Sequence, residues 1–266
     1  MLGTHLWVAD HALGFCRVDF PPPAAVAINQ NTCADTAKII SPGQPSTDGR
    51  FVYIPDNSAK SQGVWRLEFF PATETVGNLT LLAPNGGLGG NRVTASALGP
   101  DGNLYVGFLR NGNILRVTTP GGLSQLVQTV ATTSDGRGMS ALAFVGSDLY
   151  AAEGGAVTKV ANAGACSACK AVPTTSTALA PTALASDGTN LYISDTPGID
   201  STILRFTIAT GAEITFSNTG VFPDGTTTSY KFVTGLSVAN GSLFVGDDPT
   251  DGAQIIQGHV WKVLTN

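Results

Sequence analysis

The sequence predicts an all-β fold: a six-bladed β-propeller of four-stranded antiparallel blades, with incomplete terminal blades. Two observations predict this fold. Glycine and proline, 32 and 15 of 266 residues, are spread along the chain, which is typical of short strands joined by turns. One unit also recurs at intervals of 46, 52, 45, 42 and 52 residues, a period that indicates a propeller or a solenoid.

The repeated unit has an aliphatic residue followed by an aromatic one, and in five of six copies its fifth position is acidic. The aliphatic positions, expected at equivalent places on second strands, are Leu6, Val52, Leu104, Leu149, Leu191 and Leu243. Each copy continues to a basic residue before an apolar one, as at Arg116 and Arg205. We therefore expect a single domain, 1–266, with blades near 1–33, 34–84, 85–131, 132–173, 174–217 and 218–266.

Small residues precede the aromatic strand in four copies, at 96–98, 140–142, 182–184 and 234–236. They suit innermost strands, which crowd around the axis. Asp101-Gly102, Asp187-Gly188 and Asn240-Gly241 predict tight hairpin turns after these strands. Outer strands are expected at 24–29, 79–82, 123–130, 171–173 and 214–217. The first copy lacks an inner strand and the last lacks an outer one, so either the ring closes imperfectly or residues outside this numbering complete it.

Residues 97–117, ALGPDGNLYVGFLRNGNILRV, resemble the NHL repeat and the related six-bladed propellers of the gluconolactonase/SMP-30-like and strictosidine-synthase-like families. The resemblance covers nearly the whole chain at the level of the fold, and functions differ widely among such propellers. In SMP-30-like enzymes the metal ligands include a glutamate on the first inner strand. That strand is missing from the repeat pattern here, which weakens the interpretation as an enzyme.

Charge is sparse: 12% of residues are charged and the formal net charge is −5. Without a clustered basic face we expect no nucleic-acid partner, and no apolar run is long enough to span a membrane. The four cysteines predict the disulfides Cys16–Cys33 and Cys166–Cys169 and a periplasmic or extracellular location. No signal peptide is visible in the given numbering. The C-x-x-C pair also matches a redox pair, half a zinc site or a variant haem attachment, but a structural disulfide is favoured.

The loops that enter the inner strands and those between second and third strands are expected on one face around the axis. The candidate binding residues on these loops are Asp10, His11, Asp56, Arg92, Phe108, Arg137, Glu153, Asp195, Lys231 and Asp247. A strand-end acid either accepts backbone N–H bonds from its own loop or joins others as an oxygen ligand of Ca²⁺. Phe108 would give the site an apolar wall, and the long loops 218–233 and 247–258 should rim it.

Glu153, followed by two glycines, is the best candidate for a catalytic acid, and the alternative is an exposed loop glutamate. Histidine is scarce. A transition-metal site for Zn²⁺ or Cu²⁺ is expected, if anywhere, where the first and last copies meet, from His11, His259, Asp10 and Asp247. The chain contains no nucleophile elbow, phosphate loop or H-E-x-x-H motif.

Two functions follow from these patterns. The favoured one is a secreted or periplasmic propeller that binds a protein or a small-molecule ligand across its top face, and Ca²⁺ or a transition metal stays open as a cofactor. The alternative is a metal-dependent lactonase, hydrolase or lyase of the SMP-30/NHL-like type, with its site in the central channel.

Overall fold

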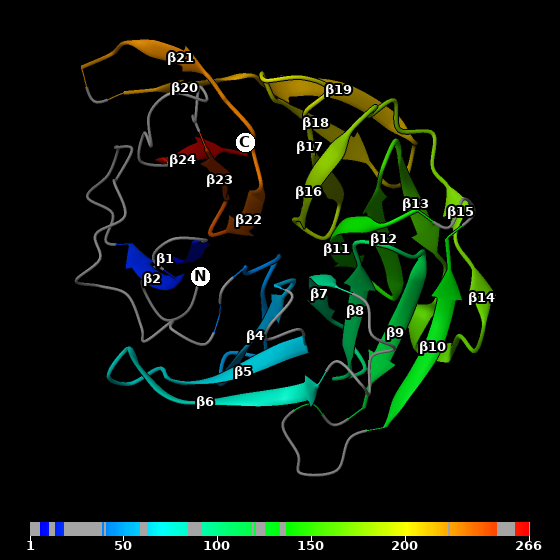
Figure 1. Ribbon diagram of the computed structural model, residues 1–266. Coiled ribbons are helices and arrows are strands. Elements are labelled where there is room, and N and C mark those ends of the chain that lie inside the picture. Colours follow the sequence, from blue (N-terminus) through cyan, green and yellow to red (C-terminus); the bar gives the residue numbers. More distant parts are fainter. Residues whose placement is uncertain are drawn as a thin grey trace.

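The protein is an all-β propeller with four-stranded antiparallel blades, whose sheets stand around a central axis (Figure 1). The computed structural model describes residues 6–10, 14–18, 39, 41–58, 63–84, 92–118, 120, 126–133, 137–222, 224–248 and 259–265. In the described part of the chain, no helix is long and apolar enough to cross a membrane.

Three sheets have four strands each, paired in chain order. They are β3 (Ser46–Thr47), β4 (Phe51–Asp56), β5 (Gly63–Phe70) and β6 (Thr75–Pro84); β11 (Met139–Val145), β12 (Asp148–Glu153), β13 (Ala156–Val160) and β15 (Val172–Pro173); and β16 (Pro181–Ser186), β17 (Asn190–Asp195), β18 (Thr202–Thr207) and β19 (Ala212–Ser217). A fourth sheet has five strands: β7 (Val93–Leu98), β8 (Leu104–Phe108), β9 (Asn113–Val117), β10 (Val127–Thr132) and β14 (Cys169–Lys170).

The remaining sheets are smaller. They are β22 (Gly235–Ala239), β23 (Ser242–Asp247) and β24 (His259–Leu264); the hairpin β1 (Leu6–Asp10) and β2 (Gly14–Val18); and the hairpin β20 (Thr219–Val221) and β21 (Thr227–Ser229). Among the described residues, five sheets have three or more strands, so the predicted count of six blades is not confirmed. The outer strand predicted at 24–29 lies outside these residues.

The core lies between neighbouring sheets. Second strands such as β8 and β12 are buried almost throughout, and their side chains pack against the next inner strand. The turns predicted from Asp-Gly and Asn-Gly are present: Gly102 has φ 73°, and Asn240 and Gly241 have φ 49° and 68°. The repeat pattern therefore specified both the buried strands and the turns that connect them.

Three inner strands carry a bulge whose hydroxyl residue bonds to the next sheet. The bulges lie at Thr94, Ser140 and Thr182. Their Oγ atoms donate to the carbonyl oxygens of Met139 at 2.5 Å, Pro181 at 2.9 Å and Val233 at 2.5 Å, respectively. The first two hydroxyls connect β7 to β11 and β11 to β16, and the third connects β16 to the loop before β22.

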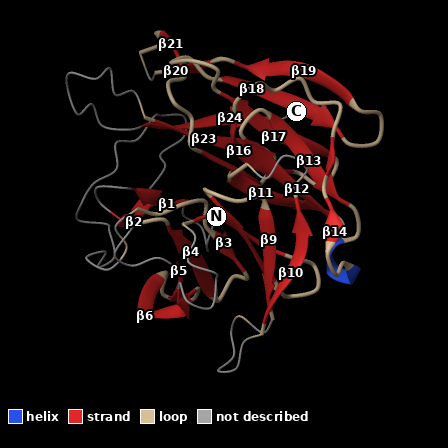
Figure 2. Cartoon of the chain, turned by 45° about the vertical axis from the view of Figure 1, so that its right-hand side comes forward, coloured by secondary structure: helices blue, strands red, loops and turns tan. Residues whose placement is uncertain are grey.

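The predicted disulfide between Cys166 and Cys169 is present, next to the 3₁₀ turn η3 (Ala163–Ala165), which lies beside β14 (Figure 2). After this turn, β14 pairs in parallel with β10 of the neighbouring blade. Cys16 is also disulfide-bonded, whereas its predicted partner, Cys33, lies outside the described residues.

Candidate functional site

The two predicted sets of loops lie at the same end of the propeller, here called the top face. In four blades a backbone bond joins the loop entering the inner strand to the loop between second and third strands. The bonds run from Asn57 N to Ser41 O (2.9 Å), Leu109 N to Arg92 O (2.8 Å), Thr196 N to Ala180 O (3.0 Å) and Asp248 N to Lys231 O (3.0 Å). The repeat therefore builds the same junction around the axis.

Strand-end aspartates on the top face bind the entering loops. The amide donors are Ser41 (3.1 Å) and Ser58 (2.9 Å) for Asp56, Leu179 (3.0 Å) and Ala180 (2.7 Å) for Asp195, and Lys231 (3.5 Å) and His259 (3.2 Å) for Asp247. All three carboxylates are buried. They act as turn organisers, one of the two roles that the sequence left open. The side chain of Asp10, the first acid of the series, lies outside the described residues.

Glu153 occupies the same position in the blade that contains β12, and it is only 2% exposed. The hydroxyl of Thr158 on β13 donates to its Oε1. The alternative of an exposed loop glutamate is therefore wrong. Glu153 is an acid held inside the blade, since burial of a carboxylate requires such polar contacts.

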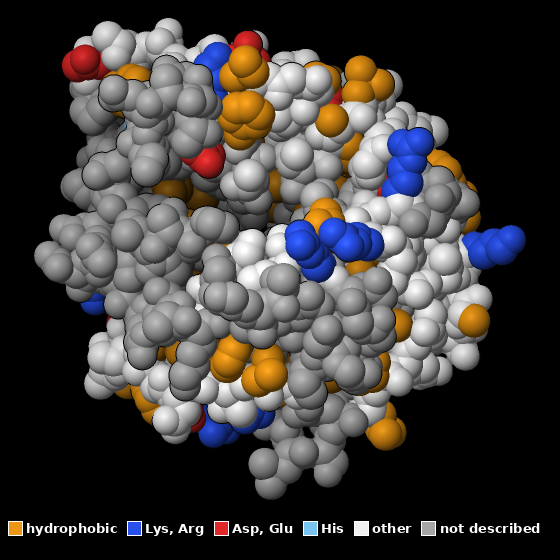
Figure 3. Space-filling model, viewed as in Figure 1, with side chains coloured by type: hydrophobic (Ala, Val, Ile, Leu, Met, Phe, Trp, Pro, Cys, Tyr) orange, Lys and Arg blue, Asp and Glu red, His pale blue; other side chains and the backbone are white. Residues whose placement is uncertain are grey.

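The basic candidates are more accessible. Figure 3 shows Lys and Arg side chains gathered beside the central hollow, over β7, β8 and β11. Arg137 and Arg110 are exposed and Arg92 is half-buried. Arg137 Nη1 donates to the carbonyl oxygen of Gly154 at 2.7 Å, which holds the guanidinium over the two-glycine loop after Glu153.

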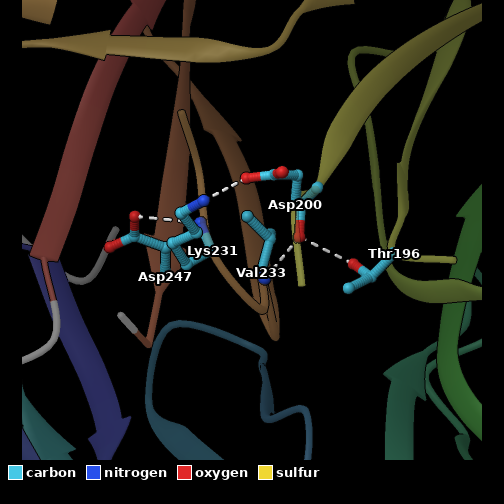
Figure 4. A network of polar contacts seen from close by, with 6 residues as sticks. Thr196, Asp200, Lys231, Val233 and Asp247 are labelled. Carbon is cyan, nitrogen blue, oxygen red and sulfur yellow. Dashed lines mark hydrogen bonds and ion pairs between the residues drawn. The ribbon is translucent and has the colours of Figure 1, made fainter. Parts of the chain in front are cut away.

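Lys231 belongs to a polar network further around the same face (Figure 4). Its ammonium group pairs with Asp200. Next to Asp200, the hydroxyl of Ser201 lies 2.7 Å from Thr196 Oγ1 and accepts the amide of Val233 at 2.9 Å. The Lys231 charge is therefore neutralised locally.

The predicted metal site is only partly within the described residues. His259 Nδ1 lies 3.3 Å from Asp247 Oδ1, so these two candidates are neighbours, and the His259 ring packs edge-on against Phe222. His11 and the side chain of Asp10 lie outside the described residues. Within the part of the chain that is described, no three His, Cys, Asp or Glu side chains converge as a metal site would require.

Phe108 does not line the face. It is 1% exposed and packs in the core with Val93 and Val106, so the predicted apolar wall is not formed by this ring. Its neighbour Leu109 is 42% exposed instead. Phe108 is the last residue of β8, a strand that is buried throughout, whereas Leu109 begins the loop that follows it.

Gln44 crosses the middle of the propeller, which the sequence did not reveal. Its Nε2 donates to the carbonyl oxygens of Leu142 at 3.0 Å and Leu184 at 3.2 Å, and its Oε1 accepts the amide of Leu142 at 2.9 Å. Its backbone pairs in parallel with Ala95 on β7. One residue thus connects β7 through its backbone and β11 and β16 through its side chain.

The predicted rim loops have more structure than expected. The loop 218–233 contains the hairpin β20–β21, and residues 249–258 of the other loop lie outside the described residues.

No protein-family model and no curated protein sequence matches the chain. Solved structures share its fold. An auxiliary nutrient binding protein from Bacteroides thetaiotaomicron aligns with a TM-score of 0.63 and 12% identity over 98% of this chain and 69% of its own. A gluconolactonase from Xanthomonas campestris aligns with a TM-score of 0.53 and 15% identity over 83% of this chain and 76% of its own. A PQQ-bound aldose sugar dehydrogenase from Streptomyces coelicolor aligns with a TM-score of 0.56 and 14% identity over 99% of this chain and 95% of its own. The fold-level resemblance to gluconolactonase-like propellers is confirmed.

Proposed function

We propose that the protein is a secreted or periplasmic binding module that recognises its ligand on the top face. One observation carries the proposal. On the described part of that face the strand-end acids Asp56, Glu153, Asp195 and Asp247 are buried, whereas Arg110, Arg137 and Leu109 are exposed. A ligand that approaches over β7, β8 and β11 therefore meets guanidinium groups and an apolar side chain. The shared fold with a nutrient binding protein supports a binding role.

The position of Gln44 supports recognition at the face rather than passage through the molecule. Its backbone pairs with β7 and its amide reaches β11 and β16, so this residue occupies the centre of the molecule at mid-height, where a ligand passing through would have to displace it. The Cys166–Cys169 disulfide supports an oxidising compartment, since such bonds rarely persist in a reducing cytosol.

We also infer that β1–β2 is part of a sixth blade. Trp7 stacks on Phe15 within this hairpin and meets Phe69 of β5 edge-on, 5.8 Å between ring centroids. The hairpin thus packs on the neighbouring sheet as the other blades do. A crystal structure with five blades would contradict this count.

The binding role is tested by measuring the melting temperature against a panel of sugars, amino acids and organic acids. A ligand of the folded state raises the melting temperature with concentration. We expect Arg137→Ala to abolish that shift while changing the melting temperature of the unliganded protein little. Glu153→Gln is expected to destabilise the fold, because it alters a buried carboxylate. A shift that survives Arg137→Ala, or a panel without any shift, would contradict the proposal.

The second candidate is a metal-dependent lactonase, favoured by the contact between Asp247 and His259 and by the fold shared with a gluconolactonase. Mass spectrometry of metals in the purified protein, before and after chelation, separates the two functions. A stoichiometric metal whose removal stops hydrolysis of a sugar lactone would favour the enzyme.

A further inference from the structure

Residues 161–171, here called the clasp, connect the blade of β11–β13 to the blade before it. The clasp starts on its own blade, where the amide of Ala163 donates to the carbonyl oxygen of Ser147 at 3.0 Å. It then reaches the neighbouring blade, because the carbonyl oxygen of Gly164 accepts from Arg116 Nη1 on β9 at 2.6 Å. Its first half therefore bridges two blades.

The second half of the clasp makes a further bond to the same neighbour. In the parallel pairing of β14 with β10, Cys169 lies opposite Ala131 and Lys170 lies opposite Thr132. The amide of Ala171 then donates to the carbonyl oxygen of Thr132 at 3.1 Å. A pairing of two residues is too short to be stable alone. The hold of β14 on β10 therefore depends on what fixes the backbone of the clasp.

The Cys166–Cys169 disulfide fixes that backbone, since it closes the turn between η3 and β14. Inside the turn Ala168 has φ 59°, in the left-handed region that residues with a Cβ atom rarely adopt. Such a conformation persists where its surroundings enforce it. Breaking the disulfide frees Ala168 to leave this conformation, and the turn loses the geometry that presents β14 to β10.

The two sulfur atoms of this disulfide differ in accessibility. Cys169 is half-buried between exposed neighbours, whereas Cys166 is 7% exposed. The Cys166 Sγ lies 3.4 Å from the carbonyl oxygen of Ala161, which can accept its S–H once the bond is broken. Cys16, which is also disulfide-bonded, is 0% exposed. A thiol in solution therefore reaches the clasp at Cys169 and does not reach Cys16.

We propose that the clasp is a redox-switched site: a dithiol reduces Cys166–Cys169 in the folded protein, and reduction releases β14 from β10. One thiolate of the dithiol attacks Cys169 Sγ, a new S–S bond forms there, and Cys166 leaves as a thiolate that takes up a proton. The second thiolate of the dithiol then attacks its partner sulfur and displaces Cys169, which is protonated in turn. The protein disulfide gains two electrons, and the dithiol becomes a cyclic disulfide.

Equilibration with mixtures of reduced and oxidised dithiothreitol, followed by alkylation and peptide mass spectrometry, tests the reduction. We expect Cys166 and Cys169 to be alkylated together while Cys16 stays unmodified. Hydrogen–deuterium exchange of the reduced protein should be faster at 163–166 and 169–171. The double variant Cys166→Ser/Cys169→Ser should show the same faster exchange without dithiothreitol.

The link between reduction and release has its own test. Release breaks the contact of Arg116 with Gly164, so Arg116→Gln should favour the reduced state and lower several-fold the ratio of reduced to oxidised dithiothreitol at half-reduction. The matched control is Arg205→Gln, because Arg205 lies opposite Tyr192 as Arg116 lies opposite Tyr105, but its guanidinium lies over Phe216. That variant should leave the ratio unchanged.

Three results would overturn the proposal. The first is a Cys166–Cys169 bond that dithiothreitol reduces only in unfolded protein. The second is a reduced protein whose exchange at 163–166 and 169–171 equals that of the oxidised protein. The third is an equal ratio at half-reduction in the Arg116→Gln and Arg205→Gln proteins, which would mean that the clasp stays on the neighbouring blade in both redox states.

Discussion

Three tyrosines at the same position in their blades donate their hydroxyls to an aspartate in the preceding turn. The pairs are Tyr53 with Asp48 (2.9 Å), Tyr105 with Asp101 (2.8 Å) and Tyr192 with Asp187 (3.0 Å). In the same turns the other carboxylate oxygen accepts backbone amides, as from Asn103 to Asp101 at 3.1 Å. In these three blades the aromatic residue of the repeat and the aspartate of the preceding turn are therefore joined by a hydrogen bond.

Tyr105→Phe is expected to lower the free energy of unfolding by about 1–2 kcal/mol, because it removes a hydrogen bond to a charged acceptor. Urea denaturation measures the loss. The comparison is Tyr150→Phe, which removes a hydroxyl that interacts with Lys159 rather than with an aspartate, because Asp148 of that blade pairs with Lys159 at 2.6 Å. Equal losses in the two variants would show that the tyrosine–aspartate bond contributes nothing specific.

The same contacts predict how stability depends on pH. Burial, followed by the hydrogen bond to aspartate, raises the pKa of Tyr105 and of Tyr192 to about 12. For Asp101, burial alone would raise the pKa, but hydrogen bonds from Asn103 and Tyr105 outweigh it and lower the pKa below 3.8.

The raised tyrosine pKa and the lowered aspartate pKa affect the stability of the protein at opposite ends of the pH range. The tyrosine contribution is complete below the ordinary pKa of 10 and is lost as the pH rises from 10 toward 12. The aspartate contribution is complete above pH 3.8 and is lost as the pH falls through the lowered pKa. Melting temperature against pH, with tyrosinate absorbance, measures both. Complete ionisation of all tyrosines near pH 10 in the folded protein would contradict this.

At the scale of elements, close backbone approach between inner strands organises the centre. A methyl group on Gly43 would lie 1.9 Å from the carbonyl oxygen of Thr94, and the obstacle is backbone that cannot rotate away. The same chain segment carries Gln44, whose amide reaches β11 and β16. Position 43 therefore has to be glycine for the second blade to contact the third.

Gly43→Ala is expected to destabilise the protein by about 2 kcal/mol or more, as overpacking against fixed atoms does. Gly198→Ala is the matched control, because nothing lies within 4 Å of a methyl group there. Thermal unfolding compares the two variants. A Gly43→Ala protein as stable as the control would mean that the two strands separate without cost.

The sequence pattern predicted second strands and turns well and other elements poorly. Second strands are buried on both faces, so aliphatic and aromatic residues mark them in every copy. The inner strand β3 carries no aliphatic–aromatic pattern. The segment before it contains Pro42 and Pro45 and is held in place by long-range hydrogen bonds of Gln44. The parallel pairing of β14 with β10 is also invisible, since it depends on the blade beside it.

At the scale of the whole molecule, the sequence predicted that the candidate residues share one end of the propeller, but it did not predict which of them are accessible. Loop positions alone grouped Asp56, Asp195 and Asp247 with Arg137. The structure separates them, because amides of the entering loops reach the carboxylates and bury them. A similar exchange buries Phe108 and exposes Leu109. Such outcomes depend on backbone geometry between blades, which a repeat pattern does not contain.

Hydrogen–deuterium exchange with and without a saturating concentration of the panel compound that raises the melting temperature tests most directly whether the top face is the binding surface. The account predicts slower exchange at 109–112, 137–138, 154–155 and 179–180. It predicts no change in the turns at the opposite end, 48–50, 101–103 and 187–189. Protection of those opposite turns, or saturating binding that leaves the top-face loops unchanged, would contradict it.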